Sequence, residues 1–122
     1  MSSRAKVNRL IMGLKEETGL PVSMETYTGD KSSFIVFSWI NMSPVYFGDD
    51  LPTFDESKVN VVLYTPIKTN ATALIDQIRD YLERKGFTVD EIWGPNPTPI
   101  GDSSKSEYNM QTVFETIYTD LH

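Results

Sequence analysis

Histidine and cysteine, the side chains that most often serve as general base, nucleophile or zinc ligand, are almost absent from this chain. Among its 122 residues the single histidine is His122, the last residue, and there is no cysteine. Because chain ends are usually frayed, we expect His122 to have no catalytic role. The sequence therefore argues against a Ser-His-Asp triad, a Cys-His pair and the usual zinc sites.

Four carboxylates crowd into one short stretch, at Asp49, Asp50, Asp55 and Glu56. Oxygen ligands at this density could hold Ca²⁺ or Mg²⁺, but the spacing does not match the Asp-x-Asp-x-Asp-Gly loop of an EF-hand. The stretch also offers no evident division between an acid and a base of the kind that a glycosidase needs. We expect a solvated or interface loop, with a weak cation site and a catalytic site as the alternatives.

Glycine and charge patterns argue against nucleotides and nucleic acids as ligands. The seven glycines are scattered and form neither a Gly-x-Gly-x-x-Gly nor a Walker pattern. The formal net charge of −6 argues against general binding to phosphates, which needs clustered Lys and Arg. The charge does not exclude that DNA passes close to the protein, because an acidic surface would repel the DNA and keep it from adhering. The sequence predicts no cofactor and no metal.

The N-terminal stretch is basic, although the helix macrodipole favours acidic residues in a first turn. One interpretation is a solvated helix face. The other is a basic patch that meets an acidic patch on a neighbouring copy or a partner, with residues 49–56 as one candidate for the second half. The only charged side chains before Glu16 are Arg4, Lys6, Arg9 and Lys15.

Two segments combine aromatic residues with the loop-forming residues Pro and Gly. Residues 44–52 contain Tyr46 and Phe47 next to acidic residues, and residues 93–100 begin with Trp93 and contain three prolines. Tyr and Trp on irregular segments are typical anchors of protein interfaces. We therefore predict contact surfaces there. The alternative is that these aromatic side chains fold back onto the sheet.

Hydrophobic periodicity and turn signals predict the elements that position these residues. Gly19 and Gly86 are expected to end the two helices in the left-handed conformation. A hairpin turn is predicted at Gly29-Asp30, and residues 41–56 and 94–106 are predicted to be irregular. Helices are predicted at 4–18 and 70–85, and strands at 22–28, 33–40, 58–65, 87–93 and 107–119.

The order of these elements is α-β-β-β-α-β-β, which predicts an α+β fold with one mixed, mostly antiparallel sheet and both helices on one face. A chain of 122 residues has the usual size of one domain, here residues 1–122. Its apolar runs are shorter than the roughly 20 residues that span a bilayer, and the N-terminus lacks the apolar core of a signal peptide. We expect a cytoplasmic protein that does not enter membranes.

Several segments in this order resemble the small tail-terminator, or tail-completion, proteins of long-tailed bacteriophages and prophages. The resemblance covers nearly the whole chain, although residues 94–106 form a longer loop than in that family. The segments that carry it are Tyr-Phe-Gly-Asp-Asp at 46–50, Val-Val-Leu-Tyr-Thr at 61–65, Lys-Gly-Phe at 85–87 and the alternating final strand at 108–118.

This resemblance implies a virion assembly protein without catalytic activity. Such a protein forms a ring, expected to be a homohexamer, that stops growth of the tail tube and joins it to the head connector. The implied partners are further copies of the chain, the tail tube protein and the head-completion protein. The protein would be found in the virion tail after assembly in the host cytoplasm.

Other functions remain open from the sequence. One is another phage head–tail joining or minor capsid protein with the same type of fold. A second is an intracellular adaptor that binds a peptide at a sheet edge and stays monomeric. A third is a small hydrolase that uses the acidic residues and a divalent ion.

Overall fold

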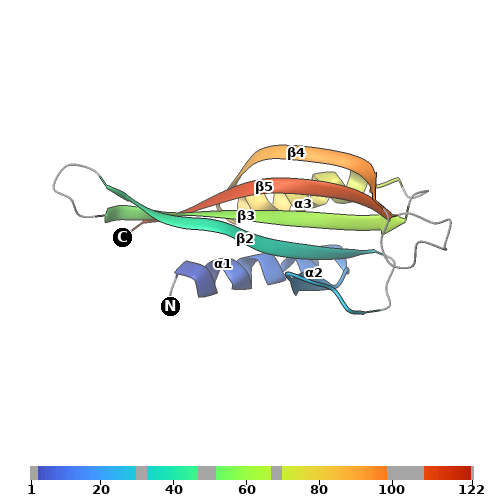
Figure 1. Ribbon diagram of the computed structural model, residues 1–122, viewed down its shortest axis with the longest axis horizontal. Coiled ribbons are helices and arrows are strands. Elements are labelled where there is room, and N and C mark those ends of the chain that lie inside the picture. Colours follow the sequence, from blue (N-terminus) through green and yellow to red (C-terminus); the bar gives the residue numbers. More distant parts are fainter. Residues whose placement is uncertain (1–2, 30–32, 47–51, 67–69, 99–108, 122) are drawn as a thin grey trace.

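The computed structural model describes residues 3–29, 33–46, 52–66, 70–98 and 109–121. Five strands form one sheet in the order β1-β2-β3-β5-β4 (Figure 1). Its helices are α1 (Ser3–Met12), α2 (Leu14–Thr18) and α3 (Thr72–Arg84), and its strands are β1 (Val22–Met24), β2 (Phe34–Tyr46), β3 (Pro52–Pro66), β4 (Phe87–Thr98) and β5 (Asn109–Leu121).

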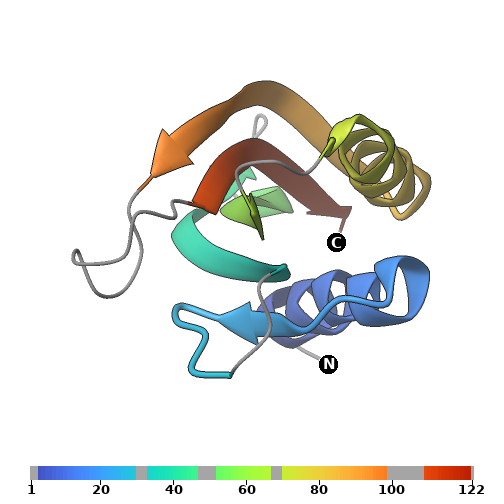
Figure 2. The ribbon, with the colours of Figure 1, turned by 90° about the vertical axis from the view of Figure 1, so that its right-hand side faces the viewer.

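The predicted α+β fold is confirmed. All strand pairs are antiparallel except β1 with β2, which run parallel. The helices α1, α2 and α3 lie on the same side of the sheet (Figure 2). We call the opposite side, which no described helix covers, the outer face.

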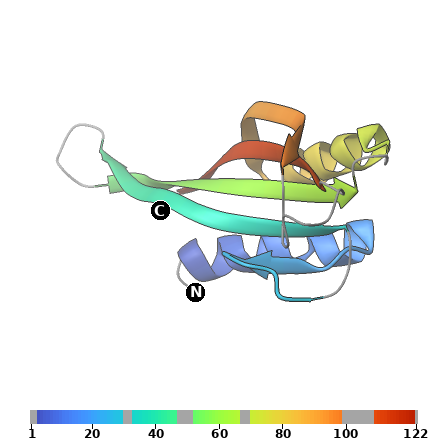
Figure 3. The same cartoon turned by 45° about the vertical axis from the view of Figure 1, so that its right-hand side comes forward.

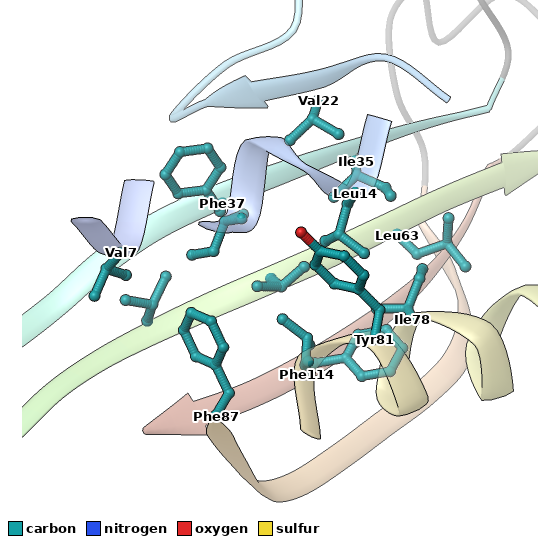
Figure 4. Packing of buried hydrophobic residues seen from close by; sticks show 14 of the residues in the cluster. Val7, Leu14, Val22, Ile35, Phe37, Leu63, Ile78, Tyr81, Phe87 and Phe114 are labelled. Carbon is teal, nitrogen blue, oxygen red and sulfur yellow. The ribbon is translucent and has the colours of Figure 1, made fainter. Parts of the chain in front are cut away.

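The core fills the space between the helices and the sheet (Figure 4). The predicted alternation along β5 is confirmed, because Thr112, Phe114, Thr116 and Tyr118 are all buried on the helix side. The helices contribute apolar side chains to this core, with Val7 and Ile11 from α1, Leu14 from α2, and Ile78, Tyr81 and Leu82 from α3.

The first predicted helix is interrupted at Gly13, which separates α1 from α2. The Tyr81 hydroxyl of α3 donates a hydrogen bond to the Leu10 carbonyl at 2.6 Å. In an uninterrupted helix this carbonyl would accept only from a backbone N–H of the next turn. A β-carbon at position 13 would overlap that hydroxyl. Gly13 therefore lets α3 pack closely on the first helix. The helix predicted at 70–85 corresponds to α3, and Gly86 follows its end in the predicted left-handed conformation, with φ +97°.

The predicted hairpin at Gly29-Asp30 is wrong, because β1 is parallel to β2. β1 is followed by Glu25, which has φ +70°. Because the two strands are parallel, β2 starts at the same end of the sheet at which β1 starts. The Tyr27 ring packs on Phe34 with 4.3 Å between ring centres. This aromatic contact holds the segment after β1 against the start of β2.

The predicted irregular segment 41–56 is also wrong where the structure describes it. β2 continues through Asn41–Tyr46 and pairs with β3 from Pro52 onward. Polar residues extend the ladder here because the backbone groups of β2 that face β3 find partners on that strand. Pro44 lacks an N–H and is compatible with this position because β2 has no strand on its other side there.

The irregular segment predicted at 94–106 is wrong over residues 94–98, because β4 continues to Thr98. Its pairing with β5 shifts between Trp93 and Asn96, around a cis peptide bond between Gly94 and Pro95. Gly94 has φ +103°, and a β-carbon there would overlap the Gln111 carbonyl of β5. The glycine and prolines that predicted a loop therefore lie at an irregularity within β4. Residues 99–106 lie outside the described residues.

The continuation of β2 and β3 forms an arm that projects from one end of the molecule (Figures 1 and 3). We define the arm as Asn41–Tyr46 of β2 with Pro52–Lys58 of β3. The 15 residues of β3 span about 50 Å at 3.3 Å each. A compact domain of this size would be only roughly 35 Å across. The arm therefore extends beyond what the core needs.

Candidate interaction surfaces

The basic side chains of α1 divide into two groups. The Arg4 guanidinium lies 4.8 Å from the centre of the Trp39 ring, and the Lys6 ammonium lies 5.6 Å from the centre of the Tyr118 ring. Such cation–π contacts contribute roughly 0.5–1 kcal/mol at exposed sites. Arg9 is exposed on the solvent side of α1. Arg4 and Lys6 therefore also attach α1 to its own sheet.

Trp39 is a contact residue that the sequence did not single out. Its indole N–H donates to the Asn8 side-chain oxygen at 2.8 Å, while Arg4 covers its ring. Trp39 lies in β2 directly before the arm, and Tyr118 faces Ser57 at the start of the arm in β3. The N-terminal half of α1 is thus fixed at the root of the arm.

The acidic residues predicted as a loop belong in part to the arm. Asp55 lies opposite Pro44 in β2 and Asp120 in β5, and partly buried Glu56 lies opposite Ser43 and Thr119. Two acidic residues, Asp55 and Asp120, therefore hold opposite register positions in β3 and β5.

Tyr46 is the last residue of β2 and pairs with Pro52 at the start of β3. The backbone thus places Tyr46 and Pro52 near the far end of the arm, where the described strands stop. Phe47, Asp49 and Asp50 were also predicted as interface residues. They lie outside the described residues.

Trp93, predicted as the last residue of a strand and the start of a contact segment, lies within β4 and is 52% exposed. It pairs with Val113 of β5, which pairs with Val62 of β3, which pairs with Val36 of β2. These four residues form an apolar row that crosses the outer face. Trp93, at the end of the row, is its most accessible member.

A second like-charge pair lies beside this row on the outer face. Exposed Glu91 of β4 pairs directly with half-buried Glu115 of β5. A shallow hollow nearby is lined by residues that include Ile40, Lys58 and Asp90 as well as Glu115. The outer face therefore combines the apolar row with acidic side chains.

Ile40 at the root of the arm is a further exposed apolar residue that the sequence did not indicate as a contact. Its side chain is 58% exposed, and the β2–β3 register shifts between Trp39 and Asn41 on either side of it. Bulges of this kind bend a strand and often re-aim a side chain. The bulge marks the point where β2 leaves the body of the sheet and enters the arm.

Among the described residues, three ionisable groups have shifted pKa values that the surrounding structure explains. Burial raises the pKa of Tyr64, which stacks on Phe34 at 4.9 Å between ring centres. Burial, with the Glu17 charge, also raises the pKa of Tyr81, while Arg84 opposes this shift. The hydrogen bond to Asp80 raises the pKa of Arg84. These groups hold α2, α3 and the sheet together.

Two further observations concern metals and membranes. In the ranges that the structure covers, no three side chains of the types His, Cys, Asp or Glu gather in a way that could hold a metal ion. No helix in the same ranges is long and apolar enough to cross a membrane.

Comparison with known proteins leaves the function to be argued from this geometry. No protein-family model matches the sequence, and no curated protein is significantly similar to it.

Proposed function

We propose that this chain is a structural assembly subunit of the phage tail-terminator type, which forms a ring without catalysing a reaction. The observation that carries the proposal is the projecting arm. A stable monomer gains little core from two strands that extend past its helices. An arm of this kind gains burial when it lies against another copy or another protein.

The distribution of charge supports assembly between copies. Subunits of a closed ring meet head to tail through two different surfaces. One candidate surface is basic, on the side of α1 where Arg9 is exposed. The other is acidic, formed by the positions of Asp55 and Glu56 in the arm and of Asp120 in the adjacent strand β5. Opposite charges on two separate surfaces favour one orientation of neighbouring subunits.

The overall negative charge supports the proposed position in a tail. DNA must cross a terminator ring without adhering to it, and a net charge of −6 per subunit would repel phosphates. The partners in this proposal are the tail tube protein on one side of the ring and the head-completion protein on the other. The site of action is the virion after assembly in the cytoplasm.

The first test is light scattering behind a sizing column over a wide concentration range. We expect a particle of six times the 13.9 kDa of one chain, formed alone or in the presence of tail tubes. In electron micrographs the protein should cap one end of each tube. A chain that stays monomeric and leaves tube ends unchanged would contradict the proposal and favour a monomeric adaptor.

Charge reversal then tests the two surfaces. Arg9→Glu is a cleaner variant than a reversal of Arg4 or Lys6, because those two side chains also contact Trp39 and Tyr118 within the chain. We expect Arg9→Glu to weaken association at least several-fold and Asp120→Lys to do the same. Association that neither reversal changes would exclude the charged surfaces as the contact.

A further inference from the structure

The outer face of the sheet carries an apolar surface that no described helix covers (Figure 2). The apolar row that ends at Trp93 crosses four strands, so it spans roughly 14 Å at about 4.8 Å between strands. An α-helix with its side chains is about 10–12 Å wide, so one helix fits across this row. Accessible apolar surface bordered by charged side chains is typical of a protein contact site.

An acidic pair lies beside the apolar row. Glu91 of β4 pairs directly with Glu115 of β5, two residues along these strands from the pair that contains Trp93. At about 3.3 Å per residue, this separation is roughly 7 Å. Like charges in directly opposite positions are destabilising, and within the described residues neither carboxylate forms an ion pair. A positive charge placed over the pair would relieve this repulsion.

The exposed side of the first helix carries the complementary pattern. Arg9 is exposed and Met12 is 41% exposed, and their spacing of three positions places them on one helix face, about 5–6 Å apart. Lys15 follows three positions later, and the helical backbone angles of Gly13 continue the turn between them. Neither Arg9 nor Lys15 forms an ion pair with a described residue. We call Arg9, Met12 and Lys15 the basic strip, which exposed Glu16 ends.

We propose that the basic strip of one copy packs on the outer face of the next copy. With the helix lying along the strands, Arg9 reaches the acidic pair and Met12 reaches the apolar row at Trp93. The spacing of about 5–6 Å on the helix then meets a spacing of roughly 7 Å on the sheet. Opposite charges fix the orientation of the two copies, and the contact buries two side chains that the free chain exposes.

The neighbour is a second molecule, because α1 lies on one side of the sheet and the outer face on the other (Figure 2). A chain cannot cover its own outer face with its own α1. A contact between two different surfaces is head to tail, which closes a ring or continues as a filament. The inference rests on the proposed function and names the surface that α1 meets. Of the two acidic surfaces, the outer face is the better match because a described apolar row borders its acidic pair.

A charge exchange within one chain tests this contact. We expect Arg9→Glu and Glu91→Arg each to weaken association about fivefold or more, because each places like charges together. A chain that carries both substitutions should recover association to within about twofold of the natural chain, because the opposite charges are restored in exchanged positions. The control combines Arg9→Glu with Asp120→Lys, which should not recover. Recovery of the control in place of the Arg9–Glu91 exchange would overturn the inference and assign α1 to the arm.

Cross-linking tests the same contact without changing a charge, because the natural chain has no cysteine. A chain with both Met12→Cys and Val113→Cys is treated with a short thiol-to-thiol cross-linker that spans the distance between a helix and the sheet on which it packs. Each chain can then link to two neighbours, so we expect covalent multimers larger than a dimer. Met12→Cys alone can give only dimers. Ala73→Cys with Val113→Cys, which uses an exposed position on α3, should give no larger multimers.

The outcomes separate the inference from the proposed function. If a six-chain particle forms but the two-cysteine chain gives no multimers beyond those of the α3 control, the inference is overturned and the proposed function survives with subunits that meet elsewhere. A chain that neither associates nor caps tubes overturns both. Multimers up to the size of the particle, together with recovery in the charge exchange, would support both.

Discussion

At the residue scale, close packing between α3 and the first helix depends on a single pair of residues. The Tyr81 hydroxyl reaches the Leu10 carbonyl at 2.6 Å because Gly13 has no side chain to block it. Gly13 has helical backbone angles, φ −63° and ψ −15°, so its value lies in the space it leaves and not in unusual backbone geometry. From the sequence alone, a glycine inside an apolar helical pattern only lowers the expected stability of the helix. The contact with α3 explains why a glycine is needed at this position.

This arrangement predicts a non-additive pair of substitutions. Gly13→Ala should lower the free energy of unfolding by about 1–3 kcal/mol through overpacking, although alanine is the better helix former. Tyr81→Phe alone should cost about 1 kcal/mol through the lost hydrogen bond. In the Tyr81→Phe background, Gly13→Ala should cost much less, because the overlapping hydroxyl is gone. Urea denaturation of the four proteins measures this. Equal costs in both backgrounds would contradict the contact.

At the element scale, the sequence predicted the helices well because their signals are local. Apolar residues at helical spacing identified both buried stripes, and Gly86 ended the last helix as expected. Strand ends were predicted poorly because partner strands determine them. Polar Asn41 and Ser43 stay in β2 because Lys58 and Glu56 of β3 lie opposite. The Gly29-Asp30 turn signal likewise did not reveal the parallel pairing of β1.

The same limit applies to the candidate surfaces. Trp93 and the basic residues of α1 could be singled out by residue type. The sequence could not show that Arg4 covers Trp39, or that Met12 and Met24 are both exposed near one sheet edge. These are contacts between residues far apart along the chain. The arm itself was hidden for the same reason, since its residues carry the composition of a loop.

The attachment of α1 to β2 gives a prediction at this scale. Asn8→Ala should remove the hydrogen bond to the Trp39 indole and lower the free energy of unfolding by about 1 kcal/mol. Because this contact lies at the N-terminal half of α1, hydrogen exchange should accelerate in α1 and stay unchanged in α3. An equal acceleration in both helices would mean that the substitution acts on the whole core. Asn70→Ala, at the exposed start of α3, is the control.

At the scale of the whole molecule, the free chain carries features that reduce its own stability. Glu91 of β4 lies directly opposite Glu115 of β5, and like charges in such positions are destabilising. Asp55 and Asp120 hold opposite register positions in β3 and β5. The projecting arm also exposes strand edges that a solitary domain would cover. These costs make sense together if a basic partner surface meets each acidic pair in an assembly. A protein selected only for monomer stability has no reason to keep them.

Glu91→Gln separates stability from assembly. Removing one charge of the pair should raise the free energy of unfolding of the isolated chain by about 0.2–1 kcal/mol. If a cationic surface of a partner lies over Glu91 and Glu115, the same substitution should weaken association. Both effects should shrink at high salt, which screens exposed charges. Glu83→Gln on α3 is the matched control. A variant that stabilises the chain without weakening assembly would place this acidic pair outside the interface, and the arm would then be the main acidic contact.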